Sequence, residues 1–196
     1  MSIWDLKAGG YDTWRHIPGI RWILEKEIRN LRFLFKLIPE IPDTIVDIGT
    51  GAGSTLGIFP DSIKVIGLDS SFEMIRQAIK QRKVKGLVGD ARRLPFKKQS
   101  IRFFSLVGVT EYIADHHNLL KEIENVLSPG GYFLTTVSPV GFFGWLRIGL
   151  GHTLRLVRRE KWEKSIKQFP FECLGQRQSI LQIQYLYKKR SEACAE

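Results

Sequence analysis

Three glycines at alternate positions constrain the fold of this chain of 196 residues more than any other feature. Gly49, Gly51 and Gly53 follow directly on a β-branched run at residues 44–48. Glycines here let the backbone turn tightly and let a ligand approach without meeting a Cβ atom. A helix that follows such a loop offers unpaired N–H groups at its start. The segment therefore predicts a strand, a ligand-binding loop and a helix.

The rest of the chain alternates between apolar runs and amphipathic segments. Further strands are expected at residues 63–68, 86–88, 101–107 and 132–137, and helices at 20–38, 71–81 and 114–127, the last ended by residues 128–131. Strands that are apolar throughout and separated by helices indicate a parallel sheet covered on both faces. The runs 171–174 and 180–187 predict a terminal antiparallel hairpin. The fold class is therefore α/β and Rossmann-like.

The residues around the glycines decide which ligand the loop suits. A dinucleotide pattern requires glycine or alanine five positions after Gly49, where this chain has Ser54. The glycine spacing, with Asp47 two residues ahead, fits a ligand with a carboxylate and an amino group but no pyrophosphate. Asp69 ends the second strand and can accept both hydroxyls of a ribose. Asp90, after the third strand, is placed to accept a hydrogen bond from an adenine amino group.

These motifs, in this order, resemble the class I S-adenosylmethionine (SAM) dependent methyltransferases, including the ubiquinone/menaquinone-type and related small-molecule enzymes. The resemblance covers roughly residues 8–138. It rests on Tyr11-Asp12-x-Trp14, the Asp47–Gly53 loop, Asp69-Ser-Ser-Phe-Glu-Met74, Gly89-Asp90-Ala91 with Leu94-Pro95-Phe96, and the stretch from Leu119 to Gly131. The family implies a seven-stranded, mostly parallel sheet whose last strand is antiparallel, and SAM as cofactor.

The resemblance also implies a role for each matching residue. Asp47, Gly49, Thr50 and Gly51 would surround the methionine part of SAM, and Asp69 would hold the ribose. The adenosine would lie between Ser70, Met74, Asp90 and Ala91, with Val107 near the sulfonium and Tyr11 closing over the cofactor. Met74 fits a place in the hydrophobic core equally well.

Candidates for the chemistry of the acceptor follow the fourth strand. Glu111 is a candidate base or substrate anchor, with Tyr112 beside it; a surface carboxylate that caps the next helix is an equal alternative for Glu111. The segment 107–110 lacks the Asn/Asp-Pro-Pro-aromatic tetrad typical of enzymes that methylate nucleobase amines. A DNA amine is therefore a less favoured acceptor.

Other classes are disfavoured by composition. The two cysteines and four histidines show no metal-ligand spacing, so no metal is expected. The chain has no signal peptide and no apolar stretch long enough to span a bilayer, which favours a cytoplasmic protein. We expect one domain over residues 1–196, with a helical cap at 1–40 and a variable substrate or lid segment at 139–170.

The net charge of +10 is concentrated at the flanks. The last 56 residues, 141–196, carry eleven Lys/Arg against five Asp/Glu, whereas residues 40–140 carry twelve against eleven. The segment 140–161 joins an apolar run to a basic one and fits a lid, a peripheral membrane contact or a helix that covers the sheet. The leading hypothesis is methyl transfer to a small, lipophilic acceptor. An RNA acceptor and a catalytically silent binding partner remain alternatives, and the oligomeric state stays open.

Overall fold

The computed structural model describes residues 18–82, 84–140 and 155–191. Within them, seven strands form one sheet in the order β3-β2-β1-β4-β5-β7-β6. The strands are β1 (Thr44–Ile48), β2 (Lys64–Asp69), β3 (Val84–Val88), β4 (Ile101–Leu106), β5 (Leu127–Val137), β6 (Phe171–Gln178) and β7 (Ile183–Lys189). β7 runs antiparallel to both neighbours, β5 and β6, and the other pairings are parallel. The predicted mostly parallel, seven-stranded fold is confirmed.

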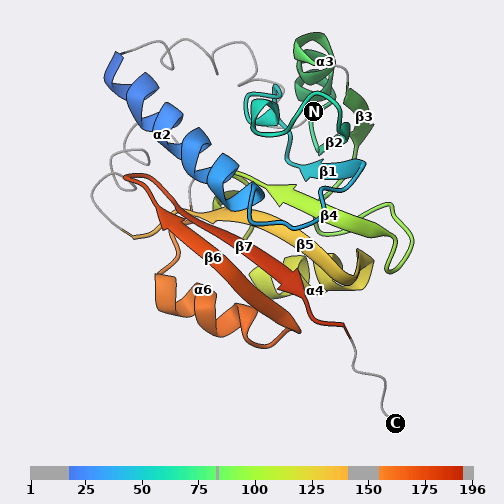
Figure 1. Ribbon diagram of the computed structural model, residues 1–196, viewed down its shortest axis with the longest axis vertical. Helices are drawn as coiled ribbons and strands as arrows, with labels where there is room; N and C mark the ends of the chain where they lie inside the picture. The colour runs from blue at the N-terminus through green and yellow to red at the C-terminus, as the bar shows by residue number, and fades with distance from the viewer. Residues whose placement is uncertain (1–17, 83, 141–154, 192–196) are drawn as a thin grey trace.

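Helices cover both faces of this sheet (Figure 1). They are α2 (Pro18–Phe35), α3 (Phe72–Gln81), α4 (His116–Val126) and α6 (Arg159–Ile166), with short 3-10 turns η1 (Leu56–Ile58) and η2 (Thr110–Tyr112). Local chemistry sets where they begin. The side chains of Ser71 and Asp115 cap α3 and α4 by accepting backbone N–H groups.

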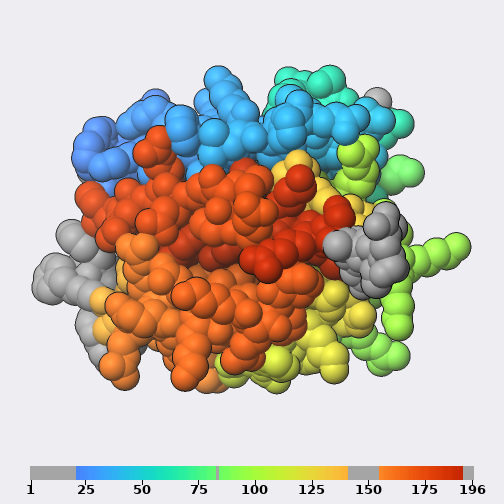
Figure 2. Space-filling view, turned by 60° about the horizontal axis from the view of Figure 1, so that its bottom comes forward, coloured from blue at the N-terminus to red at the C-terminus, as the bar shows by residue number. Residues whose placement is uncertain are grey.

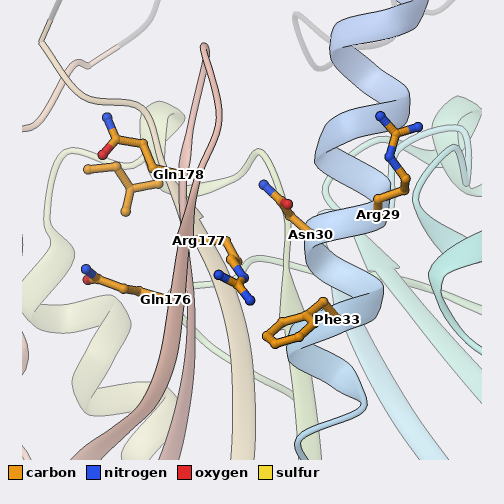
Figure 3. A pocket seen from close by; sticks show the side chains of 7 residues that line it. Arg29, Asn30, Phe33, Gln176, Arg177 and Gln178 are labelled. Atoms are coloured by element: carbon orange, nitrogen blue, oxygen red, sulfur yellow. The ribbon is translucent and has the colours of Figure 1, made fainter.

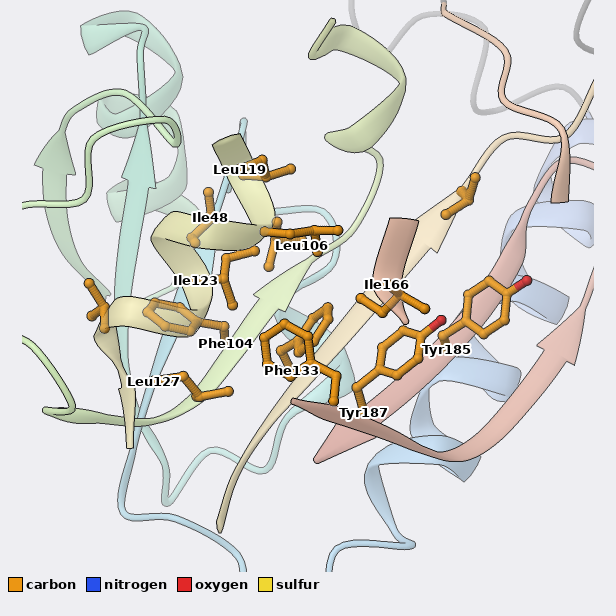
Figure 4. Close-up of a cluster of buried hydrophobic side chains, with 14 of the residues drawn as sticks. Ile48, Phe104, Leu106, Leu119, Ile123, Leu127, Phe133, Ile166, Tyr185 and Tyr187 are labelled. Atoms are coloured by element: carbon orange, nitrogen blue, oxygen red, sulfur yellow. The ribbon is translucent and has the colours of Figure 1, made fainter. Parts of the chain in front are cut away.

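Two hydrophobic cores lie on opposite faces of the sheet, because neighbouring residues of a strand point to opposite sides. On the face of α2, α3 and η1, the core includes Ile45, Phe103 and Leu134. On the face of α4 and α6, their neighbours along the strands, such as Phe104 and Phe133, pack against the helices (Figure 4). Burial on both sides explains why these strands are apolar throughout.

Several predicted boundaries were wrong. α4 ends as expected near the Ser128–Gly131 turn residues, but β5 begins there at once, with an irregular register against β4. The hairpin strands lie at 171–178 and 183–189, so Ile180 and Leu181 belong to the turn between them. A register shift between Cys173 and Gly175 removes the simple alternation that would have revealed the length of β6. None of the helices in the described ranges has the length and apolarity needed to cross a membrane.

Candidate functional site

The candidate site lies at the edge of the sheet where the parallel strands end. β1 is the point at which the strand order reverses, with β2 and β3 on one side and β4 and β5 on the other. Loops that leave the carboxyl ends of two strands at such a point diverge, and open α/β sheets bind ligands in the crevice between them. The loops after β1, β2, β3 and β4 carry most of the residues singled out from the sequence.

The glycine loop after β1 is held tightly against β2. The N–H groups of Gly49 and Thr50 both donate to the carbonyl of Leu68, at 2.7 and 3.1 Å. Gly49, Gly51 and Gly53 all have positive φ, which only glycine adopts without strain. A Cβ atom on Gly49 would lie 2.3 Å from Val109 Cγ2, whereas one on Gly51 would meet nothing within 4 Å. Gly49 therefore serves packing, and Gly51 leaves its backbone open to a ligand.

Asp69 joins this loop to the end of β2. Its Oδ2 accepts the Gly51 N–H and its Oδ1 accepts the Ser71 N–H, both at 2.9 Å. The side chain is thus fixed in one orientation, and the residue is only 9% exposed. Each oxygen of a carboxylate can accept more than one hydrogen bond. The neighbouring Ser70 is exposed.

Asp47 is a charged residue inside the sheet, at 1% exposure. Its Oδ2 has no hydrogen-bond partner among the residues that the structure describes. Burial raises the pKa of Asp47 to about 6, and the Asp69 charge acts in the same direction. The Thr50 and Ser105 hydroxyls oppose this shift in pKa. A buried carboxyl in this state is an acceptor suited to a cationic group.

Asp90, which the sequence predicts as an acceptor for an adenine amino group, follows β3 and is paired with Arg92. Arg92 binds its carboxylate through two guanidinium nitrogens and through its backbone N–H, with the shortest distance, 2.6 Å, between Nη2 and Oδ2. These hydrogen bonds hold the pKa of Asp90 below its usual value. The sequence analysis did not predict this ion pair, although Arg92 stands only two residues after Asp90. Ala91, between them, is half-buried.

Met74 and Val107 are the remaining cofactor candidates among the described residues. Met74 is buried on α3, and its N–H donates to the capping Ser71 hydroxyl. Val107 is half-buried after β4 and packs against the core under α2. The following residue, Gly108, donates its N–H to the Thr136 hydroxyl of β5 at 2.8 Å. Tyr11 lies outside the described residues.

Glu111 is buried in η2, at 1% exposure. The alternative of a surface carboxylate capping the next helix is therefore wrong, because Asp115 caps α4 by accepting the Asn118 N–H. The Glu111 backbone carbonyl also accepts the Arg155 N–H at 2.7 Å, which ties η2 to the segment before α6. Tyr112 is half-buried beside it. Glu111 thus stays a candidate for the chemistry at this edge.

The segment 140–161 is described only in part, since residues 141–154 lie outside the described ranges. From Val157 onward it packs on the sheet. Trp162 of α6 is buried and donates its indole N–H to the Tyr187 hydroxyl of β7 at 3.0 Å. Of the segment itself, Val157 and the first turn of α6 at residues 159–161 belong to the part that covers the sheet.

His116 and His117, which are adjacent at the start of α4, contact a backbone carbonyl and aromatic rings. The His116 ring lies 2.9 Å from the Thr110 carbonyl and edge-on to Trp162, and the His117 ring packs on Phe169. In the described ranges, no cluster of three or more His, Cys, Asp or Glu side chains is arranged to hold a metal ion.

Comparison with known proteins places this geometry in a family. A family model described as a methyltransferase domain matches residues 46–135. The chain is 31% identical to the demethylmenaquinone methyltransferase of Thermotoga maritima over 135 residues, which cover 67% of this chain and 58% of the relative. Across the curated relatives that it matches, the chain spans from 28% to 58% of their length.

Solved structures share the fold. A SAM-dependent methyltransferase from Thermotoga maritima has a TM-score of 0.73 and 20% identity, over 96% of this chain and all of the other. The complex between the Haloferax volcanii Trm112 methyltransferase activator and a methyltransferase gives a TM-score of 0.73 at 20% identity, over 92% of this chain and 98% of the matched one. With the glycine loop, Asp69 and the strand order, these matches identify residues 46–135 as a methyltransferase domain, and the chain has the fold of the class I SAM-dependent methyltransferases.

Proposed function

We propose that this chain binds SAM at the carboxyl edge of β1 and β2 and transfers its methyl group to a small, lipophilic acceptor. The observation that carries the proposal is the Asp69 carboxylate, held by the Gly51 and Ser71 N–H groups beside a glycine loop with an open backbone. SAM supplies a methyl group on a sulfonium, which is already activated for in-line displacement. The protein then has to align the reactants and exclude water.

The residues present fit this cofactor. The two oxygens of Asp69 match the two hydroxyls of a ribose. The Asp47 carboxyl, buried with one oxygen unpartnered in the described chain, offers an acceptor for the amino group of a methionine moiety. Asp90 would accept an adenine amino group only with the capacity that Arg92 leaves. The fit is therefore strongest at the ribose and methionine ends.

The lipophilic acceptor rests on two lines of support. One relative is named demethylmenaquinone methyltransferase. Glu111, buried after β4, would orient the acceptor or remove a proton from an acidic carbon or a phenol, with Tyr112 beside it. The basic flanks favour RNA as the second candidate acceptor; an RNA acceptor predicts affinity that falls steeply with salt, because bound RNA releases counterions.

The first experiment is a calorimetric titration with S-adenosylhomocysteine, with NAD as the control ligand. We expect binding of the first alone. Asp69→Ala should weaken it by about 1.5–3 kcal/mol, because charge-assisted hydrogen bonds to the ribose are lost. Asp61→Ala is the matched control, since Asp61 is a fully exposed carboxylate in another loop. Unchanged affinity in Asp69→Ala would refute the ribose assignment, and no binding by folded native protein would favour the role of a silent binding partner.

A further inference from the structure

The outer face of α2 carries large apolar side chains next to cations. Trp22, Phe33, Leu37 and Ile41, on α2 and just beyond it, are each between 41% and 54% exposed. At 100° per residue, Trp22, Lys26, Arg29, Phe33 and Lys36 fall within one narrow sector of the helix. That sector is opposite Leu31 and Leu34, which are buried against the sheet. We call Trp22, Lys26, Arg29, Phe33, Lys36, Leu37 and Ile41 the α2 stripe.

Two cations of this surface lie beside its aromatic rings. The Lys26 ammonium lies 5.7 Å from the centroid of the Trp22 ring. Arg177 of β6 places its guanidinium 3.9 Å from the centroid of the Phe33 ring, toward which it projects (Figure 3). No ion pair engages Lys26, Arg29, Lys36 or Arg177 within the described part of the chain. Their charges are thus available to an anionic partner.

A polar hollow opens beside the stripe. It has a volume of ≈ 520 Å³ and lies between α2 and the β6–β7 hairpin, with Arg29, Phe33 and Arg177 among its lining residues. The other lining side chains are amides and one isoleucine, so the hollow holds two cations and no carboxylate. Figure 2 shows the same neighbourhood as one continuous surface, in which side chains of α2 lie directly beside those of β6.

We propose that the α2 stripe, with Arg177, is a docking surface for an anionic lipid bilayer. Exposed tryptophan, phenylalanine and aliphatic side chains flanked by Lys and Arg insert at the boundary between headgroups and acyl chains. The charge is complementary, since the surface is cationic and the membrane anionic. Four protruding apolar side chains favour a bilayer over a nucleic acid, whose phosphates would leave them in water.

The inner face of α2, opposite the stripe, contacts the turn beside the candidate site. Glu27 of α2 accepts a hydrogen bond from the Ser179 hydroxyl at the β6–β7 turn, and Gln182 of that turn lies 4.0 Å from where a Gly108 Cβ would be. The N-terminal half of α2 therefore reaches the edge of the sheet at which β4 ends. Through these contacts, a bilayer on the outer face of α2 would sit one helix away from the turn beside Gly108.

The test is flotation of the purified full chain with phosphatidylcholine vesicles, with and without phosphatidylglycerol. We expect binding to the anionic vesicles that weakens as salt is raised, because the surface charges become screened. Lys26→Glu/Arg29→Glu and Trp22→Ala/Phe33→Ala should each lower vesicle affinity roughly tenfold or more. Lys97→Glu/Lys98→Glu is the matched control, because it makes the same charge change at exposed positions before β4 and outside the stripe.

Three outcomes would overturn the proposal. One is no binding of native protein to anionic vesicles at low salt. Another is an equal loss in the Lys97/Lys98 control, which would mean that net charge alone drives binding. The third is tight binding to bulk tRNA, with vesicle binding left unchanged by the Trp22/Phe33 double variant. Circular dichroism of each variant, with the native spectrum as reference, establishes that it is folded, and a misfolded double variant is replaced by Trp22→Ser alone.

Discussion

At the scale of single residues, two buried carboxyls lie at the edge of the sheet that we propose as the site. Asp47 and Glu111 are both 1% exposed, in a protein whose surface carries most of its charge. Keeping ionisable groups in the interior costs stability unless they are paired or neutral. We interpret both as retained for binding or chemistry, and each leads to a measurable expectation.

Asp47 should make stability depend on pH. Burial raises the pKa of Asp47 from 3.8 to about 6, so the folded state binds this proton more tightly than the unfolded state. The free energy of unfolding then falls as pH rises from about 4 to about 6, and levels off above that range. Asp47→Asn removes this pH dependence. The difference in free energy of unfolding between variant and native protein should therefore be about 2–3 kcal/mol more favourable to the variant at pH 7 than at pH 4. Urea unfolding of native and variant protein at the two pH values measures this difference. If Asp47→Asn changed the pH dependence no more than Asp61→Asn at an exposed position, the raised pKa of Asp47 would be contradicted.

Substitution of Glu111 should lower the turnover rate without weakening cofactor binding. In Glu111→Gln the shape of the side chain is kept and its basicity is lost, so we expect S-adenosylhomocysteine affinity within twofold of native and turnover lowered by roughly 10²–10⁴-fold. The control is Glu172→Gln on the exposed side of β6. Equal turnover in the two variants, measured with whichever acceptor the native protein methylates, would remove Glu111 from the reaction.

At the scale of elements, α3 packs on the edge strand β3 through a glycine. A Cβ atom on Gly86 would lie 2.4 Å from Ile75 Cγ2 and 2.9 Å from Ile79 Cδ1 of α3. Gly86→Ala should therefore destabilise the protein by about 1–3 kcal/mol through overpacking. Gly57→Ala, where a Cβ meets nothing within 4 Å, should change the free energy of unfolding by less than about 0.5 kcal/mol. Denaturant titration compares them, and equal effects would show that α3 moves freely to make room.

The sequence predicted the structure best where the first two strands end. The glycine loop and Asp69 were placed correctly because a β-branched run followed by glycines fixes both the strand and its exit. The burial of Glu111 was not predictable from local sequence, because η2 is held by long-range contacts such as the hydrogen bond from the Arg155 N–H to the Glu111 carbonyl. The full length of β6 was also missed, because its mostly exposed residues show no two-residue alternation. Local patterns thus specify elements, whereas long-range packing decides edges and loops.

At the scale of the whole molecule, cofactor binding should raise thermal stability. A ligand that binds only the folded state adds about 2.7 kcal/mol when present at roughly a hundred times its dissociation constant. For a chain of this size that corresponds to a rise in Tm of about 5–10 °C. We expect this rise in a thermal melt with S-adenosylhomocysteine and none with NAD. Equal shifts with both would point to a general nucleotide effect and count against a SAM site.

The position of β7 has a consequence for how this protein is made. β7 is the last strand of the sheet in chain order, yet it lies between β5 and β6 and is the strand with which β6 pairs. On the ribosome, β6 therefore emerges before the strand it needs, and the side of β5 later covered by β7 stays open until residue 189 has left the exit tunnel. An unpaired strand edge of this kind attracts other nascent chains. The sheet is thus completed only after its final strand has been translated, and until then that edge of β5 is open to pairing with other chains.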